Sequence, residues 1–406
     1  MGEGEGARSG EWGGDGRGAL PASAVRRLVE VTHPSHMPST SSRLRHAAGA
    51  VVLLALAACS SSETGVLIAA AGNWDAGYGE MNKRGIELAV EQVNRDGGVR
   101  GRPLRVIERN DKGEGTRAVS IAAEFVANPE IVAVVGHVNS GTMIAAAPVY
   151  NQGLPAVSTT ASTPDLTGIS PWVFRVISSD SVNGLDLARF ARSRGFERAA
   201  VLYENNSYGR GLAQSFERNF GGTIIASDPI PSERDGNYEP FITWLSRRKP
   251  DVVFVAGTEI SGLAILRESR RQRFAPAFMG SDGWTGVVVD TALAEGAYVG
   301  APFSAQDPRA DAQRFTAAFR EKYGIDPDGN AALAYDATML VAKAIAEGGA
   351  TRAAVRDWLA GRTTEKPVPG ITGPLAFDRS GDVVGKGYVM TRVRGGALVV
   401  EGARRS

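Results

Sequence analysis

Three short loops of this 406-residue chain carry side chains that suit a small charged ligand. The first, residues 136–142, places Ser140 at the expected start of a helix. Free backbone N–H groups and the helix dipole favour a carboxylate or a phosphate at such a position. Ser140 could equally act only as the cap of that helix. The sequence therefore leaves an anion site and a simple helix cap as even alternatives.

The other two loops also follow expected strands. Residues 158–163 hold five hydroxyl side chains in six positions, and their hydroxyls and carbonyls could serve both a carboxylate and an ammonium group. The plain alternative is a Ser/Thr-rich turn. In residues 280–284, Asp282 could receive a cation and Trp284 could cover an apolar group, or Asp282 could simply be a turn residue. Ligands of open α/β sheets bind at such strand ends.

Signatures of catalysis are weak by comparison. Residues 113–118 fit a Gly-x-Gly-x-x-Ala dinucleotide loop, but they follow the second expected strand, and no acidic residue clearly ends the next strand. No nucleophile elbow or Gly-Lys-Ser/Thr phosphate loop occurs in the sequence. His137 is the one histidine after residue 46, and it has no clear nucleophile partner. A nucleotide-dependent enzyme built on the Gly113 loop is therefore the weaker reading.

Composition excludes several classes of protein. Lys and Arg number 45 against 44 Asp and Glu, so the basic excess typical of nucleic-acid binders is missing. The single cysteine excludes an intrachain disulfide and a thiolate metal cluster. Metal ligands do not cluster in the sequence, and neither a metal nor a cofactor is expected. No apolar run reaches the roughly 18 residues of a membrane-spanning helix.

Short apolar runs alternate with amphipathic segments from residue 66 onward, which predicts βαβ units and parallel sheets. About four units precede Trp172 and four follow Arg198, so we expect two α/β lobes, each a doubly wound parallel sheet, with residues 171–176 passing between them. Later helices are expected at 310–323, 331–347 and 352–359, and tail strands at 373–378 and 387–400. The expected sheet strands are 66–71, 104–108, 131–135 and 154–158 in the first lobe, and 199–203, 223–226, 251–256 and 277–280 in the second.

The first 64 residues have the pattern of an export signal and a tether. Residues 1–36 are Gly-rich and lack an apolar period, so we expect a disordered extension or a start that belongs at Met37. Residues 37–58 combine a basic region, an apolar run and small residues, as a signal peptide does. Residues 56–59, Leu-Ala-Ala-Cys, resemble the bacterial lipoprotein box, with Cys59 as the acylated residue and 59–64 as the tether.

Motifs spread along the mature chain resemble the branched-chain amino-acid-binding proteins of ABC importers, the Leu/Ile/Val-binding family of type I periplasmic binding proteins. The similarity covers residues 65–401. It includes Ser-Tyr-Gly-Arg-Gly at 207–211 and Gly-Pro-Leu-Ala-Phe-Asp at 373–378, together with segments 78–90, 94–102, 135–137 and 278–280. The resemblance implies two lobes that close on a ligand about a hinge of three chain crossings.

By the same resemblance, the crossings lie near residues 177–180, 301–305 and 371–373. Lobe 1 then comprises residues 65–179 and 305–371, and lobe 2 comprises 180–304 and 372–406.

The resemblance also implies a set of ligand contacts. The α-carboxylate of the ligand would be held by Ser140 and Ser162, and the backbone carbonyl of Thr160 matches a further contact position of the family. Asp282 would hold the α-ammonium group. Tyr208 and Tyr78 match the aromatic positions of the family. The side-chain pocket would have Trp74, Thr258 and Trp284 near it, with Thr258 in place of a tyrosine.

These implications describe a binding protein and not an enzyme. We expect an extracytoplasmic, periplasmic lipoprotein, anchored to membrane lipid through Cys59. It would act as a monomer, capture an amino acid (branched-chain-like or a related amide) and deliver it to an ABC permease in the inner membrane. No cofactor and no nucleic-acid partner are expected. A ligand-sensing receptor subunit of the same fold is the alternative.

Overall fold

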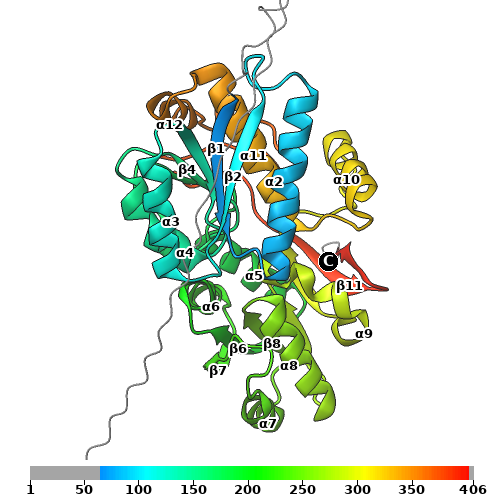
Figure 1. The fold of residues 1–406 in the computed structure, drawn as a ribbon. Helices are drawn as coiled ribbons and strands as arrows, with labels where there is room; N and C mark the ends of the chain where they lie inside the picture. The colour runs from blue at the N-terminus through cyan, green and yellow to red at the C-terminus, as the bar shows by residue number, and fades with distance from the viewer. Residues whose placement is uncertain (1–64, 402–406) are drawn as a thin grey trace, which may run out of the picture. The chain divides into compact units, whose positions relative to one another are not determined.

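Two sheets form the framework of residues 65–401, the part of the chain that the computed structural model describes (Figure 1). The expected signal peptide, Cys59 and tether lie outside this part. The first sheet has the strand order β2-β1-β3-β4-β5, with every pair parallel. Its strands are β1 (Val66–Gly72), β2 (Leu104–Asn110), β3 (Ile131–Gly136), β4 (Ala156–Ser158) and β5 (Val173–Arg175).

The second sheet has the order β12-β11-β10-β9-β8-β6-β7. Strands β6 to β10 are parallel, and β11 and β12 add an antiparallel hairpin at one edge. The two doubly wound sheets expected from the sequence are therefore present. The strands are β6 (Arg198–Glu204), β7 (Thr223–Ile230), β8 (Val252–Ala256), β9 (Ala277–Gly280), β10 (Tyr298–Ala301), β11 (Val389–Arg394) and β12 (Ala397–Val400).

Strand β1 shows why the apolar runs predicted the sheets. Its Val66, Ile68 and Ala70 pack into one core, whereas Ala69 and Ala71 pack into the core on the opposite face. Successive side chains of a strand point to opposite faces. A strand that is covered on both faces therefore needs an apolar residue at nearly every position.

Helices cover both faces of each sheet (Figure 1). No helix among residues 65–401 has the length and hydrophobicity to cross a membrane. The first sheet carries α2 (Gly77–Arg95), α11 (Gly329–Gly348) and α12 (Arg352–Ala360) on one face, and α3 (Gly115–Ala127) and α4 (Ser140–Tyr150) on the other, with α10 (Ala310–Tyr323) outside α11. The second sheet carries α5 (Asp180–Ser193) and α6 (Ser207–Asn219) on one face, and α7 (Glu239–Arg248), α8 (Glu259–Arg271), the 3-10 helix η3 (Asp282–Asp290) and α9 (Thr291–Ala294) on the other. A short 3-10 helix, η2 (Pro164–Leu166), follows β4.

Three expectations about the chain path are wrong. Residues 171–176 do not pass between lobes, because Val173–Arg175 pairs with β4 as the fifth strand of the first sheet. Residues 373–378 form no strand and contribute only two isolated bridges, at Leu375 and Phe377. The segment from 372 was expected in lobe 2, yet Leu375, Phe377 and Val383 are buried in the core of the first sheet. The last passage therefore lies after Val383 and before β11.

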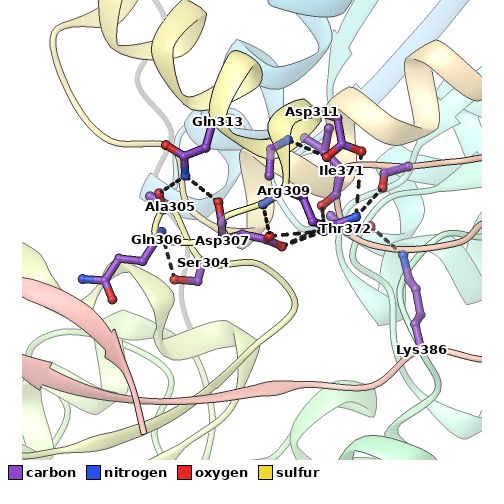
Figure 2. Close-up of polar contacts among 12 residues, drawn as sticks. Ser304, Ala305, Gln306, Asp307, Arg309, Asp311, Gln313, Ile371, Thr372 and Lys386 are labelled. Carbon is purple, nitrogen blue, oxygen red and sulfur yellow. Dashed lines mark hydrogen bonds and ion pairs between the residues drawn. The ribbon is translucent and has the colours of Figure 1, made fainter. Parts of the chain in front are cut away.

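Polar contacts join the segment that follows β10 to residues 370–372 (Figure 2). The Arg309 guanidinium, just before α10, donates to the carbonyls of Gly370 and Ile371. Asp336 of α11 accepts hydrogen bonds from the Ile371 and Thr372 backbone N–H groups, at 2.8 and 2.9 Å. These contacts hold residues 370–372 against both α10 and α11.

A partly buried lysine completes this network. Lys386 Nζ donates to Thr372 Oγ1 at 2.6 Å, and Thr372 Oγ1 donates to Asp336 Oδ2 at 2.5 Å. Burial lowers the pKa of Lys386 to about 8, although the negative charge of Asp336 opposes that shift. Burial likewise raises the pKa of Asp336. We call Arg309, Asp336, Thr372 and Lys386 the hinge cluster.

Gly85 sets the distance between α2 and α11, so Gly85→Ala is expected to destabilise the protein. A Cβ at position 85 would lie 2.2 Å from the Ala331 carbonyl oxygen, which is backbone and cannot rotate away. We expect the free energy of unfolding to fall by about 1–3 kcal/mol in urea denaturation followed by circular dichroism.

Gly115→Ala is the matched control. Its Cβ would meet only the Ala145 side chain, at 3.4 Å, in the first turn of α3. Stability should be unchanged or rise by up to about 1 kcal/mol. Equal effects of the two substitutions would contradict this account of the packing between α2 and α11.

Candidate ligand-binding site

A cavity of about 330 Å³ lies at the carboxyl ends of strands from both sheets. Its walls come from the loops after β1 to β4 of the first sheet and after β6 to β9 of the second. The strand order reverses between β1 and β3, and again between β6 and β8, which are the places where open α/β sheets bind ligands. The predicted site residues that line it are Tyr78, Ser140, Thr160, Tyr208, Thr258 and Asp282.

The first turn of α4 forms one wall. Ser140, Gly141 and Thr142 line the cavity, so the positive end of the helix dipole borders it. The reading of Ser140 as the helix cap is wrong, because the N-cap residue is Asn139 and no side chain caps this turn. Instead, Ser140 Oγ accepts a hydrogen bond from the Thr163 N–H at 3.3 Å. This wall can therefore receive an anion.

The hydroxyl-rich loop after β4 contributes less than expected. Thr160 lines the cavity, and its hydroxyl donates to the Val138 carbonyl at 2.9 Å. Ser162 is fully buried and does not line the cavity, because its hydroxyl donates to Asp180 Oδ2 at 3.0 Å. The structure therefore does not bring the Ser162 side chain to the site.

Asp282 forms the opposite wall, from the second sheet. The residue is 6% exposed, and its Oδ1 accepts hydrogen bonds from Tyr208 Oη at 2.8 Å, Tyr388 Oη at 2.7 Å and Ser281 Oγ at 2.9 Å. No ion pair to Asp282 occurs among the described residues. Burial raises its pKa, whereas the three hydroxyl donors act in the opposite direction. A cation that enters the cavity would supply the missing countercharge.

A second buried carboxyl group lies behind Asp282. Asp180, the first residue of α5, accepts hydrogen bonds from Ser162 and from Asn183. Burial and the negative charge of Asp282 together raise the pKa of Asp180. Asp180 therefore keeps its proton to a higher pH than an exposed aspartate does, and Asp282 is the carboxyl group of the pair that lines the cavity.

Tyr78 connects the loops after β1 and β3. Its hydroxyl accepts from Asn73 Nδ2 at 3.1 Å and from Asn139 Nδ2 at 2.8 Å, which leaves its own proton free to be donated. Asn139 Oδ1 is buried and has no hydrogen-bond partner in the protein. Asn73, Tyr78 and Asn139 all line the cavity, so the Tyr78 hydroxyl is available as a donor to a ligand there.

Glu204 is a cavity residue that the sequence reasoning missed. It is 2% exposed, and it accepts hydrogen bonds from Thr258 N and Oγ1, Ser261 Oγ and Asn206 Nδ2, at 2.8 to 3.0 Å. Its position as the last residue of β6 was the available signal. Tyr388, which the sequence reasoning also missed, precedes β11 and carries no local signal of its role.

The two tryptophans do not flank a side-chain pocket as expected. Trp284 is fully buried in the core beside α8, where a Cβ on Gly262 would come within 2.7 Å of its ring. Trp74 packs against the core of the first sheet. Neither residue lines the cavity. Both are large apolar side chains beside Gly residues, and the space that these glycines leave is filled by the rings.

His137 has a structural position. It is fully buried, with Nδ1 2.6 Å from Asp111 Oδ2 and Nε2 2.9 Å from Tyr150 Oη, and it does not line the cavity. Among residues 65–401, no group of three or more His, Cys, Asp or Glu side chains is placed to hold a metal ion. The arrangement at the cavity suits non-covalent binding of a zwitterion, with an anion site at α4 and a cation site at Asp282.

Comparison with known proteins gives the same picture. Residues 64–397 match the family model described as periplasmic binding protein. A leucine-, isoleucine-, valine-, threonine-, and alanine-binding protein of Pseudomonas aeruginosa is 30% identical over 86% of this chain and 95% of its own length.

Two solved structures extend the comparison. A substrate-binding protein of an ABC transporter from Desulfitobacterium hafniense, in complex with leucine, is 31% identical (TM-score 0.73; 83% of this chain and 100% of the other). The branched-chain amino acid transporter substrate-binding protein LivJ from Streptococcus pneumoniae, in complex with isoleucine, is 26% identical (TM-score 0.77; 82% and 98%). These relatives are binding proteins and not enzymes, which confirms the class expected from the sequence. The chain thus belongs to the periplasmic binding protein family.

Proposed function

We propose that this protein captures an amino acid between its two sheets and delivers it to an ABC import permease. The observation that carries the proposal is the facing pair in one cavity: the uncapped first turn of α4 and the buried carboxylate of Asp282. An amino acid carries an anion and a cation on one carbon atom, so it satisfies both walls at once. The names of the relatives, which bind leucine or isoleucine, support the same class of ligand.

In this proposal, the α-carboxylate lies against Ser140 and the first turn of α4, beside Thr160. The α-ammonium group lies against Asp282, with Tyr208 holding that carboxylate in place. Tyr78 and Thr258 border the space left for the ligand's side chain. The lobes close about the connections that follow β5, β10 and Val383, and a ligand that contacts both lobes favours the closed state by its differential affinity.

The proposal includes a lipid anchor. Cys59 lies outside the described residues, and the support for acylation is its position at the end of the lipoprotein box. Each buried CH₂ of an acyl chain contributes about 0.8 kcal/mol of membrane binding, so several chains retain a protein at the surface. The first strand of the fold begins at Val66, which leaves residues 59–64 as a polar tether.

Asp282→Asn is expected to weaken binding of L-leucine by about 10- to 100-fold. The substitution keeps the shape of the side chain but removes the countercharge of the ligand's ammonium group. A charge-assisted hydrogen bond contributes about 1.5–3 kcal/mol, and about 1.4 kcal/mol corresponds to one decade of affinity. Isothermal titration calorimetry measures the change.

Two controls accompany this measurement. Affinity for 4-methylpentanoate, which is leucine without its amino group, should not fall in Asp282→Asn. Asp357→Asn makes the same change of charge on the exposed surface of α12 and should bind leucine as the unmodified protein does. Unaltered leucine affinity in Asp282→Asn would show that the ammonium group binds elsewhere.

Cys59→Ala is expected to move the protein from the membrane fraction to the soluble extracytoplasmic fraction, or to leave the precursor unprocessed. The reason is that the acyl chains are attached to that sulfur atom. Fractionation and immunoblotting of cells that express either form provide the measurement, with Ser61→Ala in the tether as the control. A processed Cys59→Ala protein that stays with the membrane would refute the anchor.

A further inference from the structure

A contact between two helix N-termini joins the lobes outside the ligand cavity. The Tyr78 N–H, in the first turn of α2, donates to Glu259 Oε1 at 3.3 Å. Glu259 is the first residue of α8, which packs on the second sheet. The N-cap residue of α2, Ala76, offers no side-chain acceptor. Glu259 of the other lobe therefore supplies an acceptor for one of the free backbone N–H groups at this helix end.

The site around Glu259 is closely packed. A Cβ on Gly77, across the contact, would lie 2.9 Å from Glu259 Oε1, and a Cβ on Gly286 would lie 3.2 Å from Glu259 Cγ. Glu259 is 8% exposed and does not line the ligand cavity. This carboxyl group therefore does not touch a ligand in the cavity, and its contact is with the backbone of Tyr78 in the other lobe.

The charge of Glu259 has little compensation. Its Oε2 is buried and has no hydrogen-bond partner. The titratable groups that face it are Tyr78 from α2, Glu204 from the end of β6 and Asp328 from the start of α11. Burial, with the added charges of Asp328 and Glu204, raises the pKa of Glu259 to about 7, against the opposing effect of the backbone N–H donors.

A second contact joins the same two lobes, and the side chain that the second lobe contributes to it, Thr285, is not titratable. Thr285 Oγ1 lies 3.1 Å from Asp328 Oδ2 and accepts from Asn330 Nδ2 at 3.0 Å. Thr285 belongs to η3, whereas Asp328 and Asn330 lie at the start of α11. This contact offers a comparison in which closure is weakened without the loss of a carboxyl group.

We propose that Glu259 is a proton-sensitive latch, which holds the two lobes closed and raises ligand affinity without touching the ligand. The proposal rests on the proposed function, because it assumes that the lobes open and close around an amino acid. When the lobes separate, Glu259 becomes exposed to water and loses its contact with α2. The contact between Glu259 and α2 therefore forms when the lobes close and breaks when they open.

The direction of the pH effect follows from linkage. In the open protein, Glu259 is expected to have the ordinary pKa of an exposed glutamate, about 4.3. In the closed protein its pKa is raised to about 7, so closure takes up a proton between these two values. The stabilisation of the closed state is complete below the lower value and is lost as the pH rises through about 7. Ligand affinity should fall over this range by at most about tenfold per pH unit.

The test compares L-leucine dissociation constants of the unmodified protein and Glu259→Gln from about pH 5 to about pH 8. Glutamine keeps an acceptor oxygen for the Tyr78 N–H but has no proton to gain. Contributions from Asp282 and from the ligand itself occur in both proteins and cancel in the ratio of the two constants. We expect that ratio to change by about tenfold or more across the range, with Glu259→Gln the tighter binder above pH 7.

Thr285→Val is the matched control. It removes a second contact between the lobes while Glu259 stays in place, so leucine affinity should be lower at every pH and should still fall as the pH rises. Gly77→Ala provides a second route if Glu259→Gln fails to fold. The added methyl group displaces the Glu259 carboxylate towards water, which should weaken binding and flatten the pH profile.

The outcomes separate the two proposals. Parallel pH profiles for the unmodified protein and Glu259→Gln, or an unchanged profile in Gly77→Ala, would overturn the latch and leave the proposed function intact. Absence of leucine binding by the folded, unmodified protein would count against both, since the latch presupposes closure on an amino acid.

Discussion

A carboxylate without a cation, buried between two lobes, constrains the site that surrounds it. Asp282 keeps its place because three hydroxyl groups from different parts of the chain donate to one of its oxygens. Two of them, from Tyr208 and Tyr388, must therefore be brought to the same point by α6 and by the segment before β11. The sheet order that places β9 between β8 and β10 makes this convergence possible. A buried ionised group with so few partners is costly unless a ligand completes it.

Other buried carboxyl groups lie along the same edge of the second sheet. Glu204, Glu259 and Asp282 follow three different strands, and Asp180 lies behind them. The first sheet answers with helix N-termini: α4 at the cavity and α2 at Glu259. At the cavity, the negative charge of Asp282 and the positive end of the α4 dipole are complementary to the two charges of a zwitterion. At Glu259, burial favours the protonated carboxyl group, whose oxygen still accepts from the Tyr78 N–H. Binding and closure thus each pair a helix N-terminus of the first lobe with an acid of the second.

Most of the framework could be predicted from the sequence, because buried parallel strands need unbroken apolar runs and helices need a periodic face. Strands such as 131–135 and 251–256 appeared within one residue of their observed limits. The third connection between the lobes was misplaced, since the apolar residues Leu375, Phe377 and Val383 would suit the core of either lobe. Six predicted site residues line the cavity. Their roles toward a ligand remain predictions.

Side-chain partners explain what could not be predicted. Ser162 satisfies its hydroxyl with Asp180, and that choice depends on a residue 18 positions away. Trp284 follows a cavity residue by two positions, yet its ring fills the space beside Gly262 and Gly280. Glu204 and Glu259 stood at strand and helix ends that the sequence did locate. Glu204 is enclosed by Asn206, Thr258 and Ser261 of its own lobe, and Glu259 by its contact with α2 of the other, and no local pattern encodes either arrangement.

The hinge cluster has a consequence for local unfolding of the protein. Asp336 is buried and Lys386 is partly buried, and Thr372 lies between them as a hydrogen-bonded bridge. Local fraying of residues 370–372 would leave the Asp336 carboxylate without these donors and would remove the oxygen that Lys386 contacts. Segments of this kind tend to exchange their amide protons only when a whole cooperative unit opens. Of the hinge-cluster residues, Lys386 alone lies in the last passage between the lobes, so its hydrogen bond to Thr372 anchors that passage to the first lobe, and the passage should resist local unfolding as long as residues 370–372 stay folded.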